Sequence, residues 1–113
     1  MNPPALGDVI AERELEVDGA AGAVVRIGRP TPDPAEGGDW RCPFQIVGLG
    51  DEAVHEAFGI DAVQALQLCL QMIDIHLASA RGAREITWLG GADLGFFPIV
   101  NLADPLEIDP DEA

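Results

Sequence analysis

The sequence contains no lysine and no tyrosine, and it has only two cysteines in 113 residues. Six arginines therefore carry all the fixed positive side-chain charge against twenty Asp and Glu residues, and the formal net charge is −14. Phosphate backbones and anionic membranes are bound chiefly through Lys and Arg, so this balance argues against nucleic acid and membrane surfaces as direct partners. The charge favours a basic protein as the partner.

Long apolar runs are also missing. No run approaches the ~20 residues that span a bilayer. The opening stretch MNPPALGDVIAERELEV places Pro3, Pro4 and Glu12 where a signal peptide would carry cations and then an apolar segment. We therefore expect a cytoplasmic protein.

Signatures of catalysis and of metal or cofactor binding are absent as well. Cys42 and Cys69 are far apart in the sequence, and His55 and His76 do not complete a zinc tetrad with recognisable spacing. Ser79, the only serine, has no G-x-S-x-G elbow around it, and the glycine-rich GGADLG lacks the Lys of a P-loop. The sequence predicts no catalytic, metal or cofactor residues, and it favours a non-enzymatic protein over an enzyme. We expect both thiols to be buried and reduced, and the alternative is a disulfide between them.

Several segments alternate between apolar and polar residues, which is typical of half-buried strands. In VIAERELEV, for example, Glu12, Glu14 and Glu16 share one face. The predicted strands are residues 9–17, 23–28, 40–48, 52–59 and 85–89, with a short helix as the alternative for 52–59. In the first hairpin we expect a turn at DGAAG, with Leu15 opposite Val25 and Glu14 opposite Arg26.

One long helix follows. Asp61, with Gln64 three residues later, resembles a capping box, and no Gly or Pro interrupts the chain from there to Arg81. At helical spacing the main apolar stripe comprises Val63, Leu66, Leu70, Ile73 and Leu77.

Leu68 and Ile75 lie beyond a narrow stripe of glutamines, where helix packing on a single sheet would leave both in water. We expect them to form a homodimer surface. The alternative is coverage within one chain by Phe96, Phe97, Ile99 and Val100.

These elements predict an α+β fold, an antiparallel sheet of four to five strands with one long α-helix packed on one face. One domain is expected over residues 1–103, followed by an acidic, mobile tail at 104–113. The glycine-rich turn after the last strand is expected to carry Leu94, Phe96 and Phe97 back over the open end of the core.

The segments CPFQIVG, FGIDAVQALQL and WLGGADLGF resemble a family of short, uncharacterised bacterial proteins, and the similarity covers residues 13–98 approximately. This resemblance implies a compact α+β domain. It assigns no activity and no catalytic residues.

The preferred hypothesis for function is a small, acidic, non-enzymatic module that binds a basic protein, as an inhibitor or immunity-type protein does. Its predicted partner-binding residues are Glu12, Glu14, Glu16, Asp104, Glu107 and Asp109, although the glutamate row is also what a solvated strand face would show. One alternative is a small enzyme or ligand-binding domain with a site between the Gly90–Phe97 loop and the helix. Another is a dimeric structural module.

Overall fold

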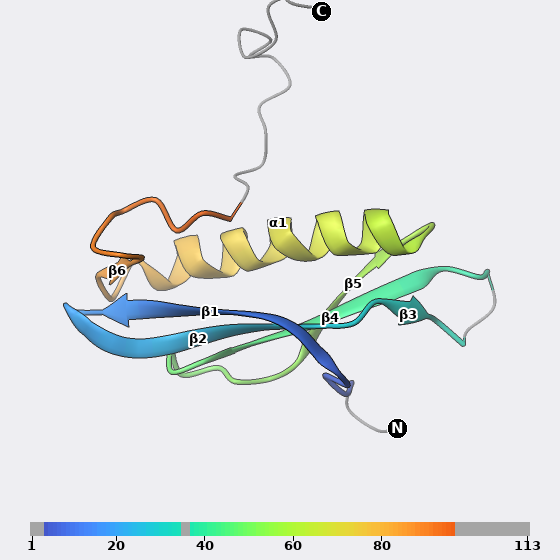
Figure 1. Cartoon of the computed structure of the whole chain (residues 1–113), viewed down its shortest axis with the longest axis horizontal. Helices are drawn as coiled ribbons and strands as arrows, with labels where there is room; N and C mark the ends of the chain where they lie inside the picture. The colour runs from blue at the N-terminus through green and yellow to red at the C-terminus, as the bar shows by residue number, and fades with distance from the viewer. Residues whose placement is uncertain (1–3, 35–36, 97–113) are drawn as a thin grey trace, which may run out of the picture.

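The computed structural model describes residues 4–34 and 37–96. It shows one six-stranded antiparallel sheet with a single helix across one face (Figure 1). In chain order the elements are β1 (Val9–Val17), β2 (Ala20–Gly28), β3 (Thr31–Pro32), β4 (Trp40–Val47), β5 (His55–Gly59), α1 (Ala62–Ala80) and β6 (Ile86–Thr87). The predicted fold class is confirmed. The sheet gains a strand because the two-residue β3 and β6 both pair within it.

The sheet runs in the order β3-β4-β2-β1-β6, and β5 pairs with the other edge of β4. On the β2–β3 side, β4 pairs at Phe44↔Ile27 and again at Arg41↔Thr31, so residues 28–30 face only residues 42–43. Pro43 therefore lies at a bulge, which suits proline because it has no N–H for a regular ladder. Within the segment 52–59, residues 55–59 form β5, so the strand-or-helix alternative is resolved in favour of a strand.

The predicted register of the first hairpin is wrong by two residues. Leu15 pairs with Ala23, and Arg26 pairs with Glu12 instead of Glu14. The reason is a turn of only two residues, Asp18 and Gly19, both at positive φ (52° and 88°), as Asp-Gly hairpin turns favour. The strands therefore begin pairing at Val17↔Ala20, three residues earlier on β2 than the expected Ala23.

The helix packs on the sheet through one stripe, with small residues in its first half and larger ones in its second half. Its buried side chains are Ala65, Cys69, Ile73 and Leu77. Val63, predicted for this stripe, is 64% exposed, whereas Leu66 and Leu70 flank the contact and are half-buried. The approach is closest near the start of the helix, where a Cβ on Gly59 would lie 2.4 Å from the Ala65 nitrogen.

The segment after β6 closes the core as the sequence predicts. Leu94 and Phe96 are buried against the sheet and helix, while Phe97 lies outside the described residues. Arg13 stacks on the Trp88 ring at 3.8 Å and donates to the Leu94 carbonyl at 3.0 Å. Within the described part of the chain, no helix is both long and apolar enough to cross a membrane.

Candidate functional site

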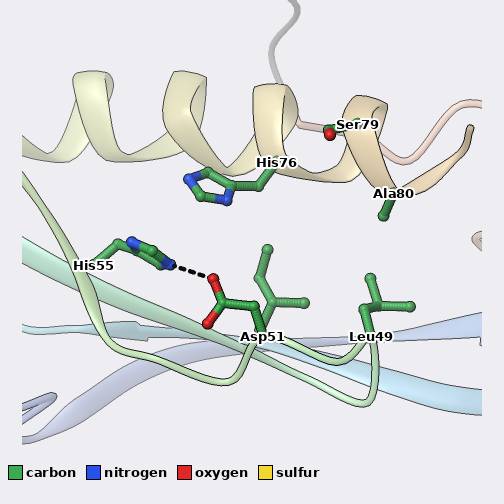
Figure 2. A pocket seen from close by; sticks show the side chains of 7 residues that line it. Leu49, Asp51, His55, His76, Ser79 and Ala80 are labelled. Atoms are coloured by element: carbon green, nitrogen blue, oxygen red, sulfur yellow. Dashed lines mark hydrogen bonds and ion pairs between the residues drawn. The ribbon is translucent and has the colours of Figure 1, made fainter.

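Two histidines that are far apart in the sequence face each other between the sheet and the helix (Figure 2). His55 is the first residue of β5, and His76 lies one turn before the end of α1. Their ring centroids are 4.5 Å apart, and both rings contact Phe44 of β4 at 5.4 Å. The packing of α1 over β4 and β5 therefore brings the two imidazole rings together against the Phe44 ring.

Asp51 completes the cluster from the loop between β4 and β5. Its Oδ1 accepts the Ala53 N–H at 3.0 Å, and its Oδ2 lies 3.3 Å from His55 Nε2. The bond from Ala53 is the main reason that the pKa of Asp51 is lowered, with a smaller contribution from His55. The carboxylate is therefore ionised at neutral pH and is held in place by its own loop.

The environment of His76 favours the neutral imidazole. Partial burial lowers its pKa from the usual 6.5, and the neighbouring His55 lowers it further, while Asp51 acts in the opposite direction. Its ring nitrogens make no hydrogen bond to another residue of the described chain. His76 thus presents an unused acceptor nitrogen at neutral pH.

The three polar side chains border a cavity of about 260 Å³. Its apolar wall comes from Ile46, Leu49 and Ala80, and Ser79 contributes from the helix side. Figure 2 shows His55 and His76 pointing toward each other, with Asp51 and Leu49 rising from the loop opposite. The cavity therefore combines hydrogen-bond acceptors with a short apolar surface.

A carboxylate bonded to an imidazole can orient that ring for proton transfer, and a second imidazole can accept a hydrogen bond. Metal binding requires a different arrangement of side chains. Among residues 4–34 and 37–96, no three His, Cys, Asp or Glu side chains are arranged to hold a metal ion. The geometry fits the recognition of a small polar ligand better than metal chelation.

The two cysteines also lie near each other in the core, between β4 and the helix that carries His76. Cys42 and Cys69 are both buried and free, and Cys42 Sγ donates to the Gly28 carbonyl at 3.6 Å. The neighbouring Cys42 thiol and the burial of Cys69 raise the pKa of Cys69 far above its usual value. A thiol in such an environment remains protonated and unreactive.

Two of the three glutamates in the predicted row are already bonded to other residues of the chain. Glu12 pairs with Arg26 at 2.7 Å, and Glu16 accepts the Thr87 hydroxyl at 2.6 Å. Glu14 alone in this row has an exposed carboxylate without an intramolecular partner among the described residues. The other predicted partner-binding residues, Asp104, Glu107 and Asp109, lie outside the described residues.

The predicted dimer residues differ from each other. Leu68 is half-buried and packs against the core, whereas Ile75 is 51% exposed. A homodimer through this flank stays a prediction, tested by sedimentation of the wild type beside the double variant Leu68→Glu, Ile75→Glu.

A second cavity of about 260 Å³ lies where the alternative ligand site was expected, between the 90–97 loop and the helix, and Gly95, Phe96 and Leu70 are among the residues that line it. Asp93 accepts the Gly95 N–H at 2.9 Å within its own turn, and it does not line the histidine cavity. Asp51, which the sequence alone did not single out, is the carboxylate that joins the two histidines. No spacing in the sequence signals this, because the cluster depends on how β5 and α1 pack.

A second feature lies at the junction between β5 and α1. Phe58, Ile60 and Val63 are 46%, 75% and 64% exposed, and we call these three residues the junction patch. Phe58 is in β5, and Ile60 and Val63 follow it at the start of the helix. The outer edge of β5 pairs with no other strand in the described part of the chain. An exposed strand edge next to apolar side chains is the arrangement that extended peptides use for docking.

The chain matches a known protein family. The model of a domain of unknown function, DUF6968, matches residues 11–98. The chain belongs to the DUF6968 family. This confirms the resemblance to an uncharacterised family, and the DUF6968 match spans all the strands and the helix except the first residues of β1. No curated protein and no solved structure matches the chain.

Proposed function

We propose that this DUF6968 protein is a non-enzymatic binding module that holds an extended, basic segment of a partner protein along β5. The observation that carries the proposal is the junction patch, an apolar surface at the end of an unpaired strand edge. Soluble proteins usually cover or charge such an edge to prevent unwanted pairing. Here the exposed side chains beside it are apolar.

The charges favour a basic partner. All six arginines are already engaged within the chain, four with carboxylates and two with main-chain carbonyls. Carboxylates therefore provide the excess charge that a partner meets. Two of them stand close to the junction patch, because Asp61 follows Ile60 and Asp39 precedes Trp40, which pairs with Gly59.

The free edge of β5 indicates how a partner segment would bind. A partner segment in extended conformation would extend the sheet by hydrogen-bonding to the free edge of β5, and alternate side chains would contact Phe58 on one side. Lys or Arg residues in that segment would meet Asp39 and Asp61 at the end of the strand. Main-chain bonding would supply affinity, and the apolar and acidic contacts would supply specificity.

Selection from a random peptide library tests this proposal. Peptides enriched on the wild type are expected to alternate apolar residues with Lys or Arg, and their affinity should fall as salt rises. Binding should be lost on the variant Ile60→Ser, Val63→Ser. It should persist on Val9→Ser, Ile10→Ser, which removes the same two residue types from an exposed part of β1.

Two outcomes would contradict the proposal. Peptides without basic residues would show that charge does not select the partner. Equal loss of binding on both double variants would show that the junction patch is not the docking surface.

A further inference from the structure

The histidine cavity has a chemistry that the proposed protein-binding function does not use. It lies at the start of β5, whereas the junction patch lies at its end. The cavity is slightly smaller than the ~300 to 1,000 Å³ typical of sites for drug-sized ligands. Its occupant, if it fills the space, is therefore a small molecule.

The charges of the residues that line the cavity indicate which sign of charge a ligand would carry. Among the described residues, Asp51 is the only fixed charge on the cavity wall, and no arginine lines it. The cavity also adjoins the last turns of α1, the negative end of the helix dipole. Arg81 caps this end, but its guanidinium donates to the Ile86 and Ala92 carbonyls and does not line the cavity. With a net charge of −14 on the whole chain, an anion is repelled and a cation is attracted.

The hydrogen-bonding groups narrow the ligand further. Asp51 offers carboxylate oxygens and neutral His76 offers one acceptor nitrogen, so a ligand with several N–H donors can bond to both residues. An organic ammonium group has both the positive charge and several N–H donors. The apolar wall formed by Ile46, Leu49 and Ala80 suits a short hydrocarbon chain attached to that group.

We propose that the cavity between His55, His76 and Asp51 binds a small organic amine in its ammonium form. Asp51 and His76 accept N–H bonds from the ammonium group, and the hydrocarbon part lies against Leu49. His55 holds the Asp51 carboxylate in position through the 3.3 Å contact.

The test is an NMR titration of the whole chain with n-butylammonium chloride, with n-butanol and sodium butyrate as neutral and anionic counterparts. The amine should produce saturable shifts of the His55 and His76 ring signals, and the two counterparts should not. Asp51→Asn should weaken binding about ten-fold or more, because it removes the charge from the contact.

Asp93→Asn is the matched control. Asp93 makes the same kind of turn, accepting an N–H two residues later, but it does not line the cavity. Asparagine can keep the turn bond in both variants, so a loss of amine binding in Asp51→Asn alone reports on the carboxylate. Amine binding should also weaken below pH 6.5, as His76 gains a proton and repels the cation.

Several results would overturn the inference. Tighter binding of butyrate than of the amine, or binding that strengthens in acid, would make the cavity an anion site. Saturable binding of Zn²⁺ alone that His55→Ala abolishes would make it a metal site. No shift with tens of millimolar amine would show that the cavity takes no such ligand. None of these results depends on peptide binding at the junction patch.

Discussion

The two ends of the sheet differ in the side chains that lie there. At the turn end, where the β1–β2 turn meets β6 and the end of α1, polar side chains bind the elements together. Arg84 pairs with Asp18 at 2.8 Å, and Arg81 donates to the Ile86 carbonyl at 3.0 Å. At the other end, around the junction patch, apolar side chains are exposed. Arginine also ties the junction end together, because Arg41 pairs with Glu56 of β5 and donates to the Ala5 carbonyl at 2.8 Å, but the three residues of the junction patch remain exposed there.

The largest expected contrast lies along the helix. Leu77→Ala, at the turn end, should lower the free energy of unfolding by about 2 to 5 kcal/mol, because Leu77 is fully buried and its loss leaves a cavity. Val63→Ala, at the other end, should change it by less than about 0.5 kcal/mol. Urea unfolding of both variants measures the difference. Equal losses would mean that Val63 is covered in solution.

Arg13 tests the closure of the turn end. Arg13→Met keeps much of the packing but removes the stacking charge over Trp88 and the bond to Leu94, so stability should fall by about 1 to 2 kcal/mol. Arg29→Met is the control, since its exposed contact with Asp8 at 3.8 Å should contribute less than about 0.5 kcal/mol. If the two variants were equally stable, Arg13 would not be holding the loop.

Asp61 tests the first turn of the helix beside the junction patch. Its Oδ1 accepts the Gln64 N–H at 2.8 Å, and Gln64 Oε1 accepts the Ile60 N–H at 2.8 Å, so the predicted cap is present. Asp61→Ala should cost about 1 kcal/mol, and Asp61→Asn much less, because asparagine retains an acceptor. Thermal melting measures both. An unchanged melting curve for the alanine variant would count against the cap.

The smallest expected effect is a dependence on pH at the histidine pair. The folded state lowers the pKa of His76, so the unfolded chain binds more protons and stability should fall as the pH drops below 6.5. The groups that face His76 are His55 and Asp51. His76→Gln should show a flatter dependence between about pH 7 and pH 5.5 in urea midpoints. A wild type and a variant with parallel profiles would contradict this assignment.

Much of the fold could be predicted from the sequence because the period-two strands and the capped helix are local signals. The hairpin register was missed because DGAAG offers several turn positions, and only the backbone shows that the turn ends at Gly19. The helix stripe was misplaced for a packing reason. Large apolar residues such as Val63 marked the pattern, but the close contact with Gly59 requires small ones such as Ala65 at the start of the interface.

The candidate sites were harder to predict. Sequence reasoning treated His55 and His76 separately, and their pairing depends on a tertiary contact between β5 and α1. It also treated the glutamates of β1 as one free row, whereas neighbouring strands occupy Glu12 and Glu16. Charged residues near a sheet edge are therefore poor guides to a free surface until their partners are known.

The most direct test of the account is the location of a bound peptide. An amide NMR spectrum of the wild type, recorded with a peptide selected on it, should show the largest shifts at Glu56 and Phe58 in β5 and at Val63 in the first turn of α1. The Ile60→Ser, Val63→Ser variant should lose them. Shifts concentrated along β1, at Glu12 to Glu16, would contradict the proposal that this DUF6968 domain binds its partner through β5.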